Sequence, residues 1–224
     1  MRCFDHTIYG RSNLFNKLPQ YGKRRNSNKE DHHADKAAVG KELIIMRDAI
    51  LKFNKEFVAD KGYEKYVTSK YPEMKIAILT CMDTRLVELL PAALGLKNGD
   101  VKMIKNAGGT INAPFGSAIR SLLVAIFELG VNEIMVIGHT DCGVQHIDSD
   151  KMIKHMVQRG ISEEQIDMIS YCGVDFKNWL AGFDSVEMSV QKNVELLRLH
   201  PLIPDDVKIE GYVINSETGE LLEV

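Results

Sequence analysis

Two short motifs contain side chains of the types that bind zinc. The first reads Cys81-Met-Asp-Thr-Arg, and the second reads His139-Thr-Asp-Cys142-Gly. Thiolates and imidazoles are ligands that Zn²⁺ favours, and three protein ligands leave the fourth tetrahedral position open. A structural zinc site normally fills all four positions, and no fourth cysteine or histidine lies within either motif. Cys81, His139 and Cys142 therefore predict a catalytic site with one Zn²⁺ per chain.

Neither motif is specific by itself. A His-x-x-Cys pattern arises by chance, and Asp83 with Arg85 is also the pattern of a surface ion pair that contributes little to stability. The remaining cysteines, Cys3 and Cys172, lie in a basic N-terminal segment and in a predicted helix. A disulfide framework is not expected in a chain of this length and cysteine content. The combination of both motifs carries the metal hypothesis.

Each motif begins where a predicted buried strand ends. Apolar runs rich in β-forming residues predict strands at 75–80 and 133–137. Open α/β sheets bind ligands beyond the carboxyl ends of their strands, especially at a switch point between neighbouring strands. We therefore expect the two motifs to meet at one edge of a sheet.

The wider pattern predicts an α/β fold with a mainly parallel central sheet flanked by helices. Strands that alternate with helices are typical of parallel sheets, and the last strand is expected as an antiparallel edge at the C-terminus. The predicted helices are 46–58, 114–129, a mostly helical region at 149–182, and one opened by a capping box at Asp184; the other predicted strands are 101–105, 207–214 and 219–224.

Residues 1–45 differ from the rest of the chain. Basic residues dominate up to Lys29, and no helical or strand periodicity appears. Such a segment buries too little apolar surface to offset its ordering entropy, so we expect disorder or a non-native extension. A transit peptide and a true translation start at Met46 are alternatives. The zinc domain is predicted as residues 46–224.

Composition argues against nucleic-acid and membrane partners. The formal net charge of −3 lacks the basic excess of a nucleic-acid-binding domain. No apolar run reaches the roughly 18 residues of a membrane span, and the N-terminus lacks the apolar core of a secretory signal. We expect a cytoplasmic protein.

A third motif, Lys105-Asn-Ala-Gly-Gly109, lies between the other two. Together the three motifs resemble those of β-class carbonic anhydrases, particularly the smaller prokaryotic branch. The resemblance covers residues 46–224. It implies a mainly parallel sheet, an obligate dimer, and reversible hydration of carbon dioxide to bicarbonate and a proton. The pocket glutamine of the larger plant-like branch has no match here, and Lys105 or another nearby residue is the candidate for its role.

The resemblance also implies roles for the motif residues. Cys81, His139 and Cys142 would bind zinc, and Asp83 and Arg85 would form a catalytic dyad. In some members, the aspartate that matches Asp83 closes onto the metal as a fourth ligand. Asp83 is expected to accept a hydrogen bond from zinc hydroxide, while Arg85 holds Asp83 off the metal by bidentate pairing.

Several alternatives remain open. A hydrolase of carbon disulfide or carbonyl sulfide would use the same site on a similar linear substrate. A catalytically silent zinc-binding regulatory protein is a non-enzymatic alternative, but it would have no use for Asp83 and Arg85. A nucleotide-binding protein is disfavoured because the Gly108-Gly109 segment matches neither a G-x-G-x-x-G motif nor a P-loop. The apolar helix at 114–129 and the apolar face of 46–58 favour a homodimer or a higher even oligomer.

Overall fold

The structure is a computed structural model that describes the backbone of residues 33–224 and the side chains from Met46 onward. The chain forms two compact units, Met1–Val67 and Thr68–Val224. The predictions for residues 1–32, including the basic segment and Cys3, lie outside the described residues. Among the described residues, no helix of either unit is long enough and apolar enough to cross a membrane.

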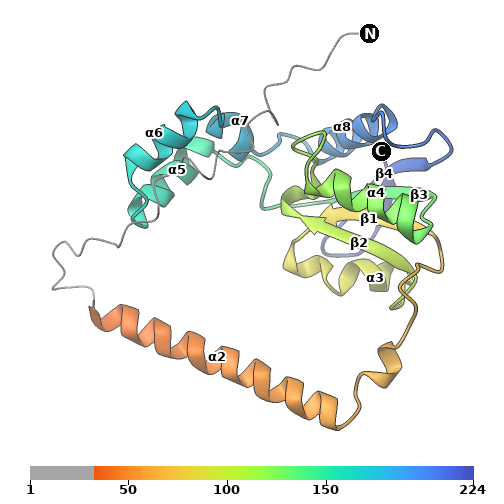
Figure 1. Cartoon of the computed structure of the whole chain (residues 1–224), viewed down its shortest axis with the longest axis horizontal. Helices are drawn as coiled ribbons and strands as arrows, with labels where there is room; N and C mark the ends of the chain where they lie inside the picture. Colours follow the sequence, from red (N-terminus) through yellow and green to blue (C-terminus); the bar gives the residue numbers. More distant parts are fainter. Residues whose placement is uncertain (1–32) are drawn as a thin grey trace. The chain divides into compact units, whose positions relative to one another are not determined.

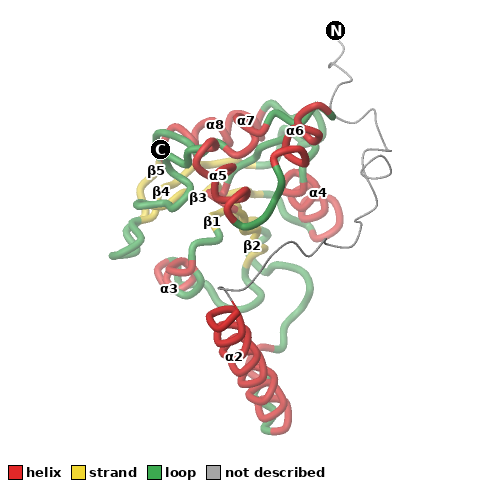
Figure 2. Tube along the Cα trace, turned by 90° about the vertical axis from the view of Figure 1, so that its left-hand side faces the viewer, coloured by secondary structure: helices red, strands yellow, loops and turns green. Residues whose placement is uncertain are grey.

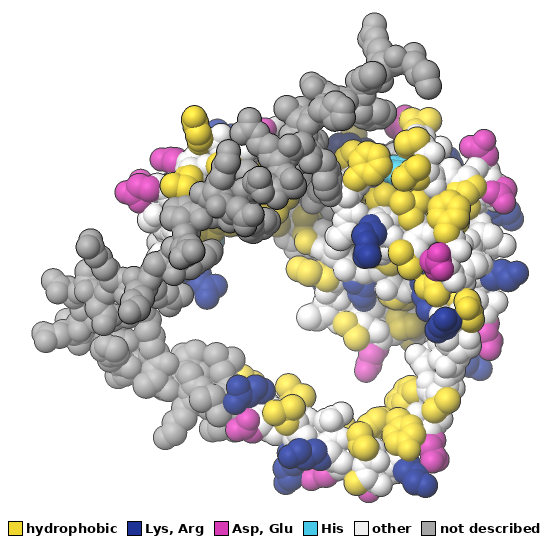
Figure 3. Space-filling model, viewed as in Figure 1, with side chains coloured by type: hydrophobic (Ala, Val, Ile, Leu, Met, Phe, Trp, Pro, Cys, Tyr) yellow, Lys and Arg dark blue, Asp and Glu magenta, His cyan; other side chains and the backbone are white. Residues whose placement is uncertain are grey.

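The described part of the first unit consists mainly of helix α2, His33–Ala59, followed by the short 3₁₀ helix η1, Glu64–Tyr66. The predicted helix at 46–58 lies within α2, but α2 begins earlier, so the predicted boundary after residue 45 falls inside a helix. Alanine and lysine recur between His33 and Met46, together with Glu42, and these residue types favour a helix without any amphipathic pattern. Apolar side chains of α2 are exposed (Figure 3), among them Ile50 at 69% and Phe53 at 68%.

The second unit is built on one mainly parallel sheet with helices on both faces (Figures 1 and 2). Its described strands are β1 (Ile76–Cys81), β2 (Val101–Asn106), β3 (Glu133–His139), β4 (Lys208–Ile214) and β5 (Leu221–Glu223), in the order β2-β1-β3-β4-β5. Its described helices are η2 (Thr84–Leu86), α3 (Leu89–Ala93), η3 (Ala107–Gly109), α4 (Ser117–Leu129), α5 (Ser149–Gln158), α6 (Glu163–Tyr171), α7 (Phe176–Leu180) and α8 (Val186–Arg198).

The strand order confirms the predicted α/β class. Strands β2, β1, β3 and β4 run parallel, and β5 pairs antiparallel with β4 at one edge. Strand β1 is buried almost throughout because it lies between β2 and β3 and is covered on both faces. Helices α4 and α8 lie over one face of the sheet and α3 lies over the other (Figures 1 and 2).

Local details differ from the sequence-based expectations at the ends of elements. Ser185, and not Asp184, caps α8, because the Ser185 hydroxyl accepts a hydrogen bond from the Met188 N–H at 3.2 Å. The predicted helix at 114–129 begins at Ser117, since Pro114 and Phe115 precede a glycine at the N-cap. Strand β1 extends to Cys81, and strand β3 extends to His139. Two of the three candidate ligands, Cys81 and His139, are therefore strand residues.

Candidate metal centre

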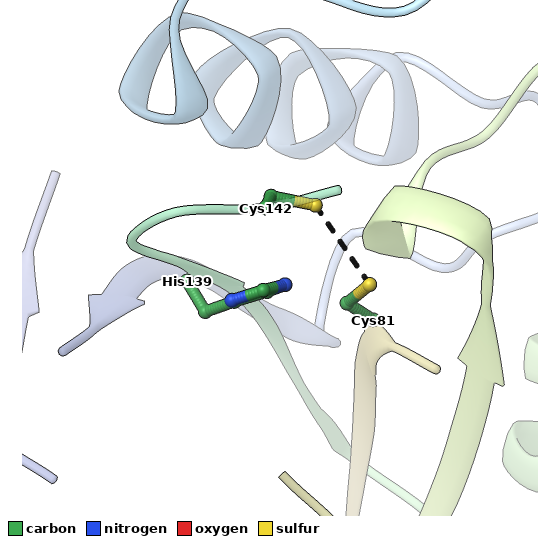
Figure 4. Close-up of side chains that lie close together, drawn as sticks. All are labelled: Cys81, His139 and Cys142. Atoms are coloured by element: carbon green, nitrogen blue, oxygen red, sulfur yellow. Dashed lines mark hydrogen bonds between the residues drawn. The ribbon is translucent and has the colours of Figure 1, made fainter. Parts of the chain in front are cut away.

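The candidate ligands lie at the switch point of the sheet. Cys81 is the last residue of β1 and His139 is the last residue of β3, and these strands pair in parallel with Thr80 opposite Ile137. The chain leaves β1 for β2 on one side and later returns to form β3 on the other side. Such a reversal opens a crevice at the carboxyl ends of the two strands. Cys142 enters the same place from the loop that follows β3 (Figure 4).

The spacing of the three side chains fits one zinc ion. The two sulfur atoms, Cys81 Sγ and Cys142 Sγ, are 3.8 Å apart, and they and a His139 ring nitrogen all lie within 4.8 Å of one another. Two thiolates bound to one tetrahedral zinc at about 2.3 Å are separated by about 3.8 Å. A disulfide would need a separation of about 2.05 Å. The geometry therefore suits shared coordination and not a covalent bond.

The histidine ring presents one nitrogen to this cluster. His139 is buried, and its Nδ1 lies 2.9 Å from the Thr140 carbonyl oxygen, to which it donates when Nδ1 carries the proton. This leaves Nε2 with a lone pair, and Nε2 has no hydrogen-bond partner, the sole such buried side-chain atom in the part of the chain described. A buried polar atom without a partner is unfavourable. A metal ion at this point would satisfy it.

Backbone N–H groups surround both sulfur atoms. The N–H groups of Asp83 and Gly108 face Cys81, and those of Val144 and Gln145 face Cys142. Burial raises the pKa of Cys81, but the nearby His139 and the two N–H groups outweigh this effect and lower it to about 7. Burial raises the pKa of Cys142. These N–H groups stabilise the negative charge of the two buried sulfur atoms when the thiols are deprotonated.

A glycine turn shapes one wall of the site. Gly108 and Gly109 both have a positive φ, and a Cβ on Gly109 would lie 2.9 Å from the backbone carbon of Thr80. The turn is closed by Asn106, whose side chain donates to the Thr110 carbonyl at 2.8 Å and accepts from the Thr110 N–H at 3.0 Å. The Gly-Gly pair therefore allows a close approach to the end of β1 that no other residue type would permit.

Asp83 and Arg85 form a bidentate pair next to the cluster. Arg85 Nε and Nη2 donate to the two carboxylate oxygens of Asp83, each at 3.0 Å. The Arg85 guanidinium holds the pKa of Asp83 down at about 2. Asp83 Oδ2 lies 3.9 Å from His139 Nε2, so this carboxylate borders the cluster beside His139.

The structure adds residues that the sequence analysis missed. Arg85 Nη1 donates to the Asp141 carboxylate at 2.8 Å, and Nη2 donates to the Asp141 carbonyl at 2.7 Å. The buried Ser216 hydroxyl donates at 3.0 Å to the same Thr140 carbonyl that His139 Nδ1 contacts. Asp141 has a sequence signal, since it lies inside the second motif as an acid that can pair with Arg85. Ser216 has no such signal.

Lys105 and Cys172 lie outside the metal-binding cluster. Lys105, at the end of β2, is half-buried and donates to the Leu86 carbonyl at 3.1 Å, and burial lowers its pKa. Cys172 follows α6 and is not part of the metal-binding cluster. The structure thus brings together Cys81, His139 and Cys142 and leaves Cys172 apart.

The chain is similar in sequence and in fold to known proteins. The family model described as carbonic anhydrase matches residues 76–221. The carbonic anhydrase candidate YtiB of Bacillus subtilis is 55% identical over 179 residues, covering 80% of this chain and 95% of YtiB. The solved β-carbonic anhydrase isoform I of Trichomonas vaginalis is 35% identical with a TM-score of 0.72, covering 79% of this chain and 95% of that one. A carbon disulfide hydrolase of Saccharolobus solfataricus is 35% identical over 161 residues, covering 66% of this chain and 76% of the hydrolase.

Proposed function

Because the chain belongs to the β-carbonic anhydrase family, we propose that it is a zinc-dependent enzyme that hydrates carbon dioxide to bicarbonate and a proton. The observation that carries this proposal is the buried cluster of Cys81, His139 and Cys142, in which His139 Nε2 has no hydrogen-bond partner within the described residues. Carbonic anhydrases are lyases acting as carbonate dehydratases, and the candidate site has the donor set that such an enzyme needs.

Cys81, His139 and Cys142 would hold one Zn²⁺ per chain through two thiolates and one imidazole. When bound, zinc with three protein ligands would lower the pKa of a water molecule in its open position and so supply a nucleophile. His139 Nδ1 contacts the Thr140 carbonyl, which fixes the ring and directs Nε2 into the cluster. Such a second contact orients a histidine ligand and raises its basicity.

Asp83 would act as an acceptor beside the reacting atoms. Its low pKa means that the carboxylate stays ionised at neutral pH. Arg85 occupies both carboxylate oxygens and holds them to one side of the cluster. The carboxylate can therefore accept a hydrogen bond next to the open coordination position, while Arg85 keeps it from closing onto the metal as a fourth ligand.

Hydrolysis of carbon disulfide or carbonyl sulfide is the second candidate function. It is favoured by the 35% identity to the Saccharolobus solfataricus carbon disulfide hydrolase. The same ligands and the same Asp83–Arg85 pair would serve either linear substrate, so the choice between them depends on access and pocket shape. A catalytically silent regulatory protein has less support, because it would not require the bidentate pair.

The test is zinc quantification together with activity assays on one preparation. We expect one zinc per chain and rapid carbon dioxide hydration measured by stopped-flow pH indicator, with slow or no release of hydrogen sulfide from carbon disulfide. Full zinc occupancy with hydrogen sulfide release and no hydration would favour the second function. Full occupancy with neither activity would favour the regulatory protein.

We also propose that the chain is a homodimer or higher even oligomer in the cytoplasm. Apolar side chains are exposed on α4, with Phe127 at 63%, and on α2, with Phe53 at 68%. A surface of this kind marks an interaction site. Two unpaired thiols in a metal site suit a reducing compartment. Light scattering that gives a monomer of 25.2 kDa would reject the oligomer.

A further inference from the structure

Arg85 bridges the two motif loops. Its guanidinium donates to the Asp83 carboxylate on the β1 side and to Asp141, 56 residues away, on the β3 side. Both contacts with Asp141, at 2.8 Å and 2.7 Å, are shorter than the 3.0 Å contacts with Asp83. The planar guanidinium is therefore held along two edges, and its orientation does not depend on Asp83 alone.

Asp141 reaches Arg85 through an unusual backbone conformation. Its φ is +53°, in the left-handed region that disfavours residues with a side chain, although aspartate and asparagine enter it more readily than most. The Asp141 carbonyl and the Asp141 carboxylate both accept from Arg85. A conformation of this kind persists only where its surroundings enforce it, and here it directs two acceptors of one residue to one guanidinium.

The side chains of Asp83, Arg85 and Asp141 differ in how exposed they are to solvent. The Asp83 side chain is 16% exposed and borders the candidate ligands, Arg85 is 38% exposed, and Asp141 is 86% exposed on the outer side. An exposed ion pair contributes little to stability, so stability does not account for Asp141. Its geometry can still matter, because it limits the rotation of Arg85.

We propose that Asp141 is a positioning residue that fixes Arg85 from the solvent side, so that Arg85 engages both oxygens of Asp83 and keeps that carboxylate beside the metal position. This inference rests on the proposed function. Asp141 precedes Cys142 in the chain, but its carboxylate accepts from Arg85, and it would act through that residue. Without the Asp141 carboxylate, Arg85 would lose one of its two contacts with Asp141 and would turn away more easily, and Asp83 would then be free to move toward His139 Nε2.

The variants Asp141→Gly and Asp141→Asn test the proposal. Glycine keeps the left-handed backbone and its carbonyl but removes the carboxylate, whereas asparagine also keeps one side-chain acceptor. Lys75→Gly is the matched control, because Lys75 also has a positive φ of 56° but precedes β1, at the opposite end of that strand from Cys81. Lys75→Gly should change neither the NMR signal of the Arg85 Nε–H group nor the kinetics of hydration.

The first readout is the Arg85 Nε–H signal in ¹H–¹⁵N NMR spectra of the full chain as purified, assigned by its loss in Arg85→Lys. This proton donates to Asp83 and not to Asp141. We expect Asp141→Gly to broaden or abolish the signal, Asp141→Asn to shift it less, and Lys75→Gly to leave it unchanged. An unchanged signal in Asp141→Gly would overturn the proposal, and Asp141→Asn decides if the glycine variant does not fold.

The second readout is the kinetics of hydration. Loss of an outer-shell partner typically lowers activity by about 10–100-fold, and we expect this decrease in kcat for Asp141→Gly with KM little changed and partial recovery in Asp141→Asn. Full kcat in Asp141→Gly would also overturn the proposal. If the unmodified chain neither binds zinc nor hydrates carbon dioxide, the proposed function fails, while the Arg85 signal still decides the role of Asp141.

Discussion

Asp83 Oδ2 lies 3.9 Å from His139 Nε2, yet both oxygens of this carboxylate are engaged by Arg85 at 3.0 Å. This carboxylate thus borders the metal position, but both of its oxygens accept hydrogen bonds from Arg85. We propose that this arrangement makes Arg85 a latch that keeps Asp83 off the metal position.

Replacing Arg85 by alanine should let Asp83 close onto the metal. The Arg85→Ala enzyme should be inactive, and its cobalt-substituted form should show no change in visible absorption when azide is added. In Asp83→Asn, activity should fall by about 10²–10⁴-fold through loss of the acceptor. Its cobalt form should still respond to azide, because the fourth position stays open. An equal azide response in both variants would contradict the latch.

Removing a candidate ligand should release the metal. Cys81→Ser and His139→Ala should each lose most of their zinc in elemental analysis, since each removes one of three donors that lie within 4.8 Å of one another. Cys172→Ser is the matched control and should keep one zinc per chain, because Cys172 is not part of the cluster. Zinc retention in both ligand variants would mean that the ligands are misassigned.

The turn at Gly109 should tolerate no side chain. A Cβ at this position would lie 2.9 Å from the Thr80 backbone, and the φ of +64° is itself unfavourable for other residues. We expect Gly109→Ala to lower the free energy of unfolding by about 1–3 kcal/mol in urea titrations. Gly143→Ala should change it by less than about 0.5 kcal/mol, since no atom lies within 4 Å of a Cβ at Gly143. Equal effects would show that the close approach is unimportant.

The pairing of Asp83 should contribute to stability in a way that depends on pH. The folded-state pKa of Asp83 is about 2, below the value of about 3.9 for an unfolded chain. A depressed carboxyl pKa stabilises the fold above the unfolded value, and this contribution is lost as the pH falls through the folded value.

The measurement for this prediction is urea unfolding of metal-free protein at several pH values from about 5 down to about 2. The advantage in unfolding free energy of the unmodified chain over Asp83→Asn should be largest at the upper end and should shrink steadily toward the lower end. A difference that does not change with pH would show that the Arg85 pairing does not favour ionised Asp83.

The N-terminal residues should be dispensable for chemistry. All candidate site residues lie in the unit Thr68–Val224. A chain shortened to begin at Met46 should fold, bind one zinc and hydrate carbon dioxide as the full chain does. A chain shortened to begin at His33 keeps the whole of α2 and serves as the comparison. Aggregation or inactivity of only the shorter chain would assign a role to the first half of α2.

The sequence by itself determined the elements of the second unit and the types of the chemical groups. Apolar runs with β-forming residues mark β1 and β3, and alternation with helices indicates a parallel sheet, because both signals depend on neighbouring residues. The types of Cys81, His139 and Cys142 indicate zinc for the same reason, since ligand preference is a property of each side chain. Element ends were less well predicted, as at the start of α2 and at the Ser185 cap.

Only the tertiary structure decided how these groups meet. The strand order and the register that places Thr80 opposite Ile137 bring the loops after β1 and β3 together. This juxtaposition creates the contact between Arg85 and Asp141, which are 56 residues apart. The contact of Ser216 with the Thr140 carbonyl arises in the same way, since Ser216 follows β4, the neighbour of β3. Local patterns predict that the two motifs meet at one edge of the sheet, but they do not fix which side chains pair there, because the pairing depends on strand order and register.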